Sequence, residues 1–259
     1  MYQNSKIDIN TIKENAAVSA VDALVKSGMK IGLGTGSTAL PAVRRVGEYL
    51  ACGKLRNIRA VSTSFETTIE CEKLGIPLFT LNSREIGGEL DLTIDGADEV
   101  DPRNYCVKGG GGALLPEKII AYVSAAYAIV VDESKIAENL GMKFPVPVEV
   151  IPEARVPVTR SLEKLGAEVK LRQAVKKAGP VITDHGNLLL DIIFGEAVDP
   201  VFLESEINRI PGVAENGFFT GPSCDRGSVP DQGRAWTPGL LWRPRVFIGL
   251  GDGTVQERK

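Results

Sequence analysis

The chain has 259 residues, of which 43% are hydrophobic and 24% are charged, a composition typical of a globular protein with a sizeable core. Lys and Arg number 30 against 33 Asp and Glu, so the net charge of −3 provides no basic field for a nucleic-acid partner. The chain lacks an apolar run of membrane-spanning length, and its start, MYQNSKIDIN, lacks the apolar stretch of a signal peptide. We therefore expect a cytoplasmic protein that binds neither nucleic acid nor membrane.

Helices and strands alternate along the first half of the chain. Hydrophobic periodicity predicts helices at 11–27, 40–50, 65–75 and 116–127, and strands at 29–34, 58–64, 76–81, 90–95, 105–108 and 128–132. This alternation predicts an α/β fold, with a Rossmann-like, mostly parallel sheet covered by helices on both faces. Ligands bind such sheets at the carboxyl ends of the strands. The loops GTGST, STS, DGADE and KGGGG are all expected there, and together they outline a site.

The pattern changes at FPVPVEVIP, residues 144–152. A strand, a helix near 153–165, the strand AEVKLRQ, a hairpin from VIT through DHGN to LLLDIIF, and a helix at 200–210 follow. This order predicts a smaller α+β (ferredoxin-like) domain with an antiparallel sheet. We assign 143–211 to this small domain, a candidate for the oligomer interface, and 1–142 and 212–259 to a Rossmann-like catalytic domain.

Cysteine and histidine chemistry is limited in this chain. The cysteines, Cys52, Cys71, Cys106 and Cys224, include no CxxC pair, so we expect scattered reduced thiols rather than a zinc or redox site. His185 is the single histidine and lies in TDHGN, a hairpin-turn composition. Acid–base chemistry is therefore expected from carboxylates, lysines, tyrosines or cysteines.

The segment GLGTGST, residues 32–38, lies between a predicted strand and a predicted helix. Its backbone N–H groups and hydroxyls suit an anion at a helix N-terminus. Ser37 and Ala39 stand where a dinucleotide GxGxxG motif would need its last glycine, and no Walker lysine follows. We therefore favour a small phosphate over a nucleotide. A tight structural turn and a methyltransferase-type site for S-adenosylmethionine are the alternatives.

Acidic and basic residues mark the other two loops. IDGADEVD, residues 94–101, places Asp95 and Asp98 just past a strand, where a magnesium site and direct proton handling are equally open. In KGGGGALLPEKI, residues 108–119, Pro116 suits the first position of a helix, and Glu117 then lies in its first turn. Glu117 could serve as a base, with a helix-capping role as the alternative. Lys135, taken alone, is expected to be a surface lysine.

The motifs are far more specific together than singly. In the order GLGTGSTA, TIDGADEVD, KGGGGALLPEKI and KFPVPVEVIP, they closely resemble ribose-5-phosphate isomerase, type A, from about residue 11 to 219. The resemblance implies interconversion of D-ribose 5-phosphate and D-ribulose 5-phosphate in the non-oxidative pentose phosphate pathway. It implies no metal and no organic cofactor, a small phosphosugar substrate, and a homodimer or homotetramer.

The resemblance also implies the roles of individual residues. The proton-transferring glutamate falls on Glu117. The substrate-binding positions fall on Thr35, Gly36, Ser37, Thr38, Asp95, Gly96, Ala97, Asp98, Lys108, Gly109, Gly110, Gly111 and Lys135. Isomerisation moves a proton between C2 and C1 through an enediolate, so Glu117 is expected to carry that proton and Lys108 to stabilise the oxyanion. Asp95 is expected to relay protons between O1 and O2, and Asp98 to orient the opened sugar or help open its ring.

The chain departs from the family pattern in three places. Pro116 stands where the family often has arginine, and Lys13-Glu14 replaces the adjacent lysines that can reach phosphate, so we do not carry that role over. Residues 220–244 look like an insertion, and a loop, a lid, an interface element and a gene-model artefact all stay open. A non-catalytic phosphosugar sensor and a magnesium-dependent phosphosugar enzyme are the competing functions.

Overall fold

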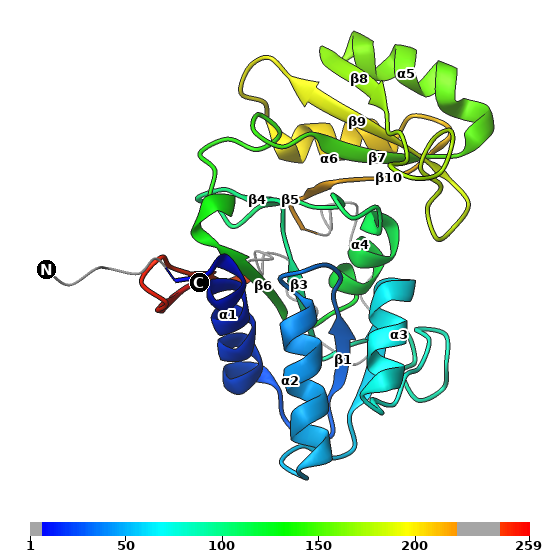
Figure 1. Ribbon diagram of the computed structural model, residues 1–259. Coiled ribbons are helices and arrows are strands. Elements are labelled where there is room, and N and C mark those ends of the chain that lie inside the picture. The colour runs from blue at the N-terminus through cyan, green and yellow to red at the C-terminus, as the bar shows by residue number, and fades with distance from the viewer. Residues whose placement is uncertain (1–6, 222–243) are drawn as a thin grey trace, which may run out of the picture.

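A computed structural model describes residues 7–221 and 244–259 (Figure 1). The main layer is a six-stranded sheet in the order β13 (Val255–Arg258), β12 (Arg245–Gly249), β6 (Tyr127–Asp132), β3 (Leu92–Gly96), β1 (Lys30–Leu33) and β2 (Arg59–Ser62). Neighbouring strands from β12 to β2 are parallel, and β13 is an antiparallel edge strand. The predicted Rossmann-like, mostly parallel sheet is confirmed.

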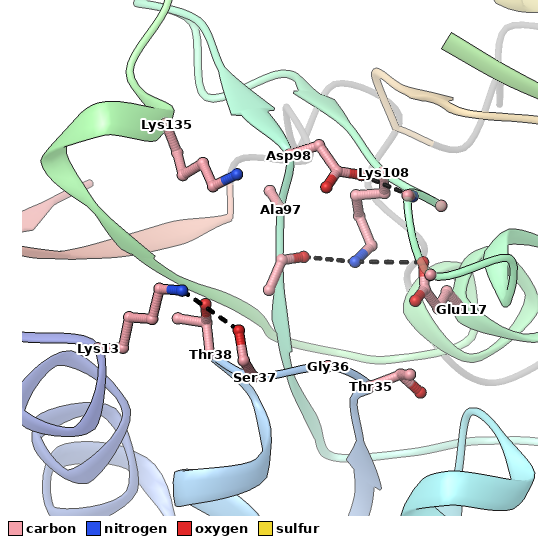
Figure 2. Close-up of a pocket in the computed structure, with 14 residues that line it drawn as sticks. Lys13, Thr35, Gly36, Ser37, Thr38, Ala97, Asp98, Lys108, Glu117 and Lys135 are labelled. Atoms are coloured by element: carbon pink, nitrogen blue, oxygen red, sulfur yellow. Dashed lines mark hydrogen bonds and ion pairs between the residues drawn. The ribbon is translucent and has the colours of Figure 1, made fainter. Parts of the chain in front are cut away.

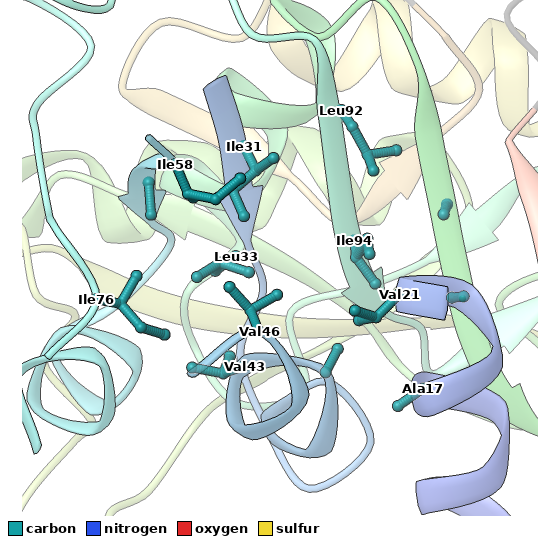
Figure 3. Packing of buried hydrophobic residues seen from close by; sticks show 14 of the residues in the cluster. Ala17, Val21, Ile31, Leu33, Val43, Val46, Ile58, Ile76, Leu92 and Ile94 are labelled. Atoms are coloured by element: carbon teal, nitrogen blue, oxygen red, sulfur yellow. The ribbon is translucent and has the colours of Figure 1, made fainter. Parts of the chain in front are cut away.

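Helices cover both faces of this sheet. Helices α1 (Ile9–Leu24) and α2 (Leu40–Ala51) lie on one face, and α3 (Phe65–Lys73) packs beside α2. Ile31 and Leu33 of β1 point to this face and pack in one core with Val21 and Val46 (Figure 3). Helix α4 (Leu114–Tyr122) packs on the opposite face of the sheet. Gly32 lies between Ile31 and Leu33 and therefore points to this face, since successive residues of a strand point to opposite sides. Ile120 of α4 comes so close to Gly32 that a Cβ there would lie 2.5 Å from Ile120 Cγ2.

A second unit has its own sheet and its own core. Its strands run in the order β10 (Val213–Asn216), β7 (Val146–Val150), β9 (Leu188–Phe194) and β8 (Ala167–Leu171), and all neighbours are antiparallel. The 3₁₀ turn η2 (Pro152–Ala154), α5 (Arg155–Lys164) and α6 (Pro200–Asn208) connect them. The chain order β-α-β-β-α-β confirms the predicted ferredoxin-like arrangement. The division at 143–211 stays a prediction, and β10 joins this sheet from just beyond that range.

A small third sheet lies between the two units and corrects one prediction. It pairs β11 (Phe218–Phe219), β5 (Cys106–Val107) and β4 (Glu99–Val100) in antiparallel fashion. The glycine run therefore follows a strand of this sheet, and the expectation that it extends from the main sheet edge was wrong. Backbone pairing with the returning chain sets this arrangement, since the Lys108 N–H donates to the Gly217 carbonyl at 2.9 Å.

The strand predicted at 76–81 is also absent from the described structure. Only an isolated bridge joins Ala60 and Leu78. In it the Ala60 N–H donates to the Pro77 carbonyl at 3.0 Å, and the Phe79 N–H donates to the Ala60 carbonyl at 2.9 Å. Pro77 cannot donate a hydrogen bond, so the pairing does not extend from this bridge toward residue 76.

Several smaller expectations concern single residues. His185 lies in an exposed turn, as predicted. Cys52, Cys71 and Cys106 are free thiols, whereas Cys224 and nearly all of the atypical segment 220–244 lie outside the described residues. Along residues 7–221 and 244–259, no helix combines the length and the apolar character needed to cross a membrane.

Candidate active site

A pocket of about 240 Å³ opens where β1 and β3 end, beside the glycine run (Figure 2). Its lining residues are Lys13, Thr35, Gly36, Ser37, Thr38, Gly96, Ala97, Asp98, Lys108, Gly109, Gly110, Gly111, Glu117 and Lys135. The structure thus brings together every predicted site residue except Asp95 at one surface. Ligand pockets commonly enclose about 300–1,000 Å³. At about 240 Å³ this pocket lies below that range, so it fits a small phosphosugar better than a dinucleotide.

The loop after β1 presents hydroxyl groups on two sides. The Thr35 hydroxyl contacts the hydroxyls of Thr63 and Ser64 at 2.6 and 2.7 Å, so the STS segment holds this side chain in place. Ser37 lies at the pocket, where its Oγ accepts a hydrogen bond from Lys13 Nζ at 3.3 Å (Figure 2). Helix α2 begins directly after this loop with no side-chain cap on its N-terminus. The loop therefore offers hydroxyls and a helix N-terminus to an anion.

Lys13 is a pocket residue that sequence reasoning set aside. It lies on α1, and its ammonium group lines the same end of the pocket as Ser37, Thr38 and Lys135 (Figure 2). The signal was present in the sequence, because the family's adjacent lysines occupy these positions and one of the two is kept. Lys135 sits in the 3₁₀ turn η1 (Glu133–Lys135), with Nζ 5.7 Å from the centre of the Phe144 ring. Lys13 and Lys135 thus give this end of the pocket two positive charges.

Lys108 forms the centre of a buried ionic cluster. Its Nζ lies 3.0 Å from Asp95 Oδ2 and 3.4 Å from Glu117 Oε2, and it donates a short hydrogen bond to the Gly96 carbonyl. The side chains of these three ionisable residues are no more than 6% exposed. One ammonium group therefore faces two carboxylates in a site with little solvent, where charge interactions are strong.

Burial raises the pKa of Glu117 to about 8, and the negative charges of Asp95 and Asp98 add to the rise, while Lys108 opposes it. The two carboxylates hold the pKa of Lys108 well above its ordinary value, against the effect of burial. The cluster is neutral when Glu117 is protonated and Asp95 is ionised. Glu117 can therefore gain and lose a proton near neutral pH, as a general base must.

Asp95 lies beneath the pocket surface and is 0% exposed. Its Oδ1 accepts hydrogen bonds from the N–H groups of Thr35 and Gly96 at 3.1 and 2.8 Å, and its Oδ2 faces Lys108. Gly34 makes this approach possible, since a Cβ at position 34 would lie 2.0 Å from Asp95 Oδ1. Asp95 thus ties the loop after β1 to the ammonium group of Lys108.

Asp98 fixes the glycine run from the pocket side. Its Oδ2 accepts a hydrogen bond from the Gly110 N–H at 2.8 Å. A Cβ at position 110 would lie 2.7 Å from Asp98 Oδ1 and 2.9 Å from Phe144 Cζ. Gly109 has φ +98°, a left-handed conformation that favours glycine. The glycines therefore allow a close, left-handed path past Asp98.

The remaining acids of the DGADEVD motif have structural partners. Glu99 accepts hydrogen bonds from three backbone N–H groups, at positions 141, 143 and 144. Asp101 accepts from the N–H groups of Arg103 and Tyr105 at 2.8 and 2.9 Å. Both carboxylates therefore hold loops in place, which leaves Asp95 and Asp98 as the acids of this motif at the site.

The start of α4 differs from the prediction in one respect. The helix begins at Leu114, so Pro116 is its third residue and the expectation of a first position was wrong. The third position still has no intrahelical acceptor for an N–H group, so proline costs no helix hydrogen bond there. Glu117 lies in the first turn, as predicted.

Comparisons with known proteins identify the family of this chain. Residues 59–229 match the profile of the family described as ribose 5-phosphate isomerase A (phosphoriboisomerase A). Ribose-5-phosphate isomerase A of Treponema denticola is 49% identical over 258 residues, covering 97% of this chain and all of that protein. The chain belongs to the ribose 5-phosphate isomerase A family. The same-named protein of Thermosynechococcus vestitus is 50% identical over 211 residues, covering 82% of this chain and 88% of that protein.

Solved structures of this family of isomerases share the fold. Ribose 5-phosphate isomerase A from Methanocaldococcus jannaschii superposes with a TM-score of 0.83 and 39% identity, covering 97% of this chain and 100% of that one. A D-ribose-5-phosphate isomerase solved in complex with phospho-erythronic acid also gives a TM-score of 0.83, at 36% identity and with the same coverage.

Proposed function

We propose that this protein interconverts D-ribose 5-phosphate and D-ribulose 5-phosphate through an enediolate, in the non-oxidative pentose phosphate pathway. The observation that carries the proposal is the Lys108 ammonium group between Asp95 and Glu117 at the pocket. An aldose–ketose isomerase needs one group that moves a carbon-bound proton and one cation that stabilises the oxyanion formed when it leaves. Membership of the isomerase family supports the same reaction.

In the proposed mechanism, Glu117 in its ionised form removes the proton from C2 of the open-chain aldose. The electron pair of the C2–H bond forms the C1–C2 double bond, and the charge moves to O1, where Lys108 stabilises it. The O2 hydroxyl proton is transferred to O1, and Glu117 returns its proton to C1, which leaves a ketone at C2. The pKa of about 8 for Glu117 suits both the removal and the return of this proton.

The two aspartates have separate proposed roles. Relay of the proton between O2 and O1 is assigned to Asp95, whose Oδ2 lies 3.0 Å from Lys108 Nζ. Asp98 lines the pocket directly and is assigned the opening of the ring and the orientation of the open sugar. Substitution of each aspartate by asparagine tests the two assignments separately. Asp95→Asn should lower kcat for isomerisation in both directions. Asp98→Asn should act most strongly on the cyclic substrate.

We place the phosphate at the end of the pocket formed by Lys13, Ser37, Thr38 and Lys135. Two ammonium groups, two hydroxyls and the N-terminus of α2 meet there. The phospho-erythronic acid complex of the related isomerase supports a site for a short phosphorylated sugar acid. A phosphate at this end leaves C1 and C2 to reach Lys108 and Glu117.

The assembly, the cofactor requirement and the location remain parts of the proposal. We propose a cytoplasmic homodimer or homotetramer that acts without a metal or an organic cofactor. Light scattering on the purified protein measures the assembly, and a monomeric mass would overturn it.

The decisive experiment is isomerisation of ribose 5-phosphate by the purified protein in the presence of EDTA. We expect ribulose 5-phosphate to form. Binding of the sugar phosphate without turnover would favour a sensor. Activity that EDTA abolishes and magnesium restores would favour a metal-dependent enzyme, and tight binding of S-adenosylmethionine would favour a methyltransferase.

A further inference from the structure

An arginine of the small unit reaches into the glycine run of the active site. Arg172 directly follows β8 and forms a two-pronged ion pair with Asp191 of β9, through Nε at 2.8 Å and through Nη2. Its third nitrogen, Nη1, donates to the carbonyls of Gly109 and Gly110 at 3.2 and 3.0 Å. The Arg172 side chain is only 16% exposed. The guanidinium group thus joins the small unit to the loop that lines the pocket.

This contact helps to fix where the loop's N–H groups point, together with the Gly112 N–H, which also donates to the Gly109 carbonyl, at 2.9 Å. The carbonyl and the N–H of a trans peptide point in opposite directions, and the described chain has no cis peptide. Because the Gly109 carbonyl points to Arg172, the N–H of Gly110 points away from it, and that N–H does reach Asp98 Oδ2 at 2.8 Å. By the same geometry, the Gly110 carbonyl directs the N–H of Gly111 away from Arg172. Gly111 lines the pocket, so this donor lies on the part of the loop that borders the space for a ligand.

We propose that Arg172, held by Asp191, is a positioning residue that orients the Gly109–Gly111 peptides so that the Gly111 N–H binds a substrate oxygen. This inference rests on the proposed isomerase function. Arg172 touches neither Lys108 nor Glu117 in any contact described above, so it acts through the backbone of the loop. The small unit thereby contributes to the active site, since the ion pair of Arg172 and Asp191 lies at strands β8 and β9 of its sheet (Figure 1).

The guanidinium group is suited to this position in a way that lysine is not. Its planar fork binds a carboxylate with two nitrogens and leaves the third free for the carbonyls. A lysine ammonium has no such fork, so Arg172→Lys keeps the charge but loses the fixed direction. Asp191→Asn keeps the shape of the side chain but weakens the hold on the guanidinium group.

The test compares Arg172→Ala, Arg172→Lys and Asp191→Asn with wild type in ribose 5-phosphate isomerisation. Lys170→Met is the matched control, because Lys170 lies on the same β8 strand, opposite Asp191 in the ladder, and the ion pair of its ammonium group is with the exposed Glu168. We expect kcat/KM to fall by about ten- to a hundredfold in Arg172→Ala, with smaller losses in the other two. The midpoint of the pH profile should not move, since Arg172 has no contact with Glu117. Millimolar guanidinium ion should restore part of the Arg172→Ala activity, whereas Lys170→Met should behave as wild type with or without it.

Each outcome decides the inference separately from the proposed function. Inactive wild-type protein would refute the isomerase function itself. Active wild type with wild-type kcat/KM in Arg172→Ala would overturn the positioning role. Loss of activity with a lowered melting temperature and no guanidinium rescue would also overturn it, because that pattern belongs to a purely structural ion pair. Loss of activity with rescue supports the inference.

Discussion

Replacement of Lys108 by methionine removes the cation at the centre of the buried cluster. Methionine fills a similar volume but leaves Asp95, which is 0% exposed, without its ionic partner. It also removes the ammonium group 3.4 Å from Glu117. The substitution should therefore change stability, catalysis and the ionisation of Glu117 together.

The structure sets the size of each change. Breaking a buried ion pair by removing one partner costs about 3–5 kcal/mol. Asp95 keeps its two backbone N–H donors, so we expect a loss of about 3 kcal/mol in the free energy of unfolding. Loss of one oxyanion-stabilising group lowers kcat by about 10²–10³. Because Lys108 opposes the rise in the pKa of Glu117, that pKa should move upward from about 8.

The assay is kcat/KM for ribose 5-phosphate as a function of pH, together with urea unfolding. Wild type should gain activity as pH rises through about 8, where Glu117 ionises. The Lys108→Met profile should be lower and its midpoint shifted to higher pH.

Lys118→Met is the matched control for this experiment. Lys118 is 3% exposed, and its Nζ lies 2.9 Å from Glu204 and 2.8 Å from Glu215. It is thus a second buried lysine between two carboxylates, one residue beyond Glu117. Its loss should cost similar stability and leave the pH midpoint where wild type has it. The reasoning is refuted if Lys108→Met keeps the wild-type midpoint, or if Lys118→Met shifts the midpoint as far.

Three further predictions follow from the same geometry. Gly110→Ala should lower kcat/KM by about tenfold or more, because the new Cβ would lie 2.7 Å from Asp98 Oδ1. Gly195→Ala is the control and should leave kcat/KM unchanged, because no atom lies within 4 Å of its Cβ. Equal kinetics for the two variants would contradict the packing argument. Lys13→Met and Lys135→Met should each raise KM by about tenfold with a smaller change in kcat, since each loses a charge-assisted hydrogen bond to the phosphate. An unchanged KM would show that the phosphate does not bind at this end of the pocket. Burial raises the pKa of Glu117 from 4.5 to about 8, so the stability contributed by its neutral form is present below pH 4.5 and is lost as pH rises through about 8. Glu117→Gln stays neutral and should resist urea better than wild type above pH 8, and parallel stability curves would argue against the raised pKa.

The main sheet could be predicted from sequence because its signals are local. Apolar strands alternate with amphipathic helices, and each loop carries its own motif, so order and type follow from residues near in the chain. The segment 76–81 shows the limit of this approach, since its apolar residues predict a strand, whereas it forms only an isolated bridge at Leu78, next to a proline that cannot donate. Whether a segment pairs depends on its neighbours, which periodicity does not report.

The site shows the same division between local and long-range information. Glu117, Lys108 and Asp98 were found through their motifs and do line the pocket. The burial of Asp95 depends on how closely Gly34 approaches it, a contact across 61 residues of sequence that no motif encodes. The contact of Arg172 with Gly109 is equally remote in sequence and joins two units. Lys13 was set aside because one lysine of a pair was missing, although its position on α1 still brings it to Ser37.

The central claim is that Glu117 carries the proton between C2 and C1. The most direct measurement is turnover of ribose 5-phosphate deuterated at C2, with EDTA present, by wild type and by Glu117→Gln. We expect a primary isotope effect for wild type, and for Glu117→Gln a fall in kcat of about 10³ or more with the fold intact by circular dichroism. Wild-type turnover in Glu117→Gln would contradict the assignment of the base.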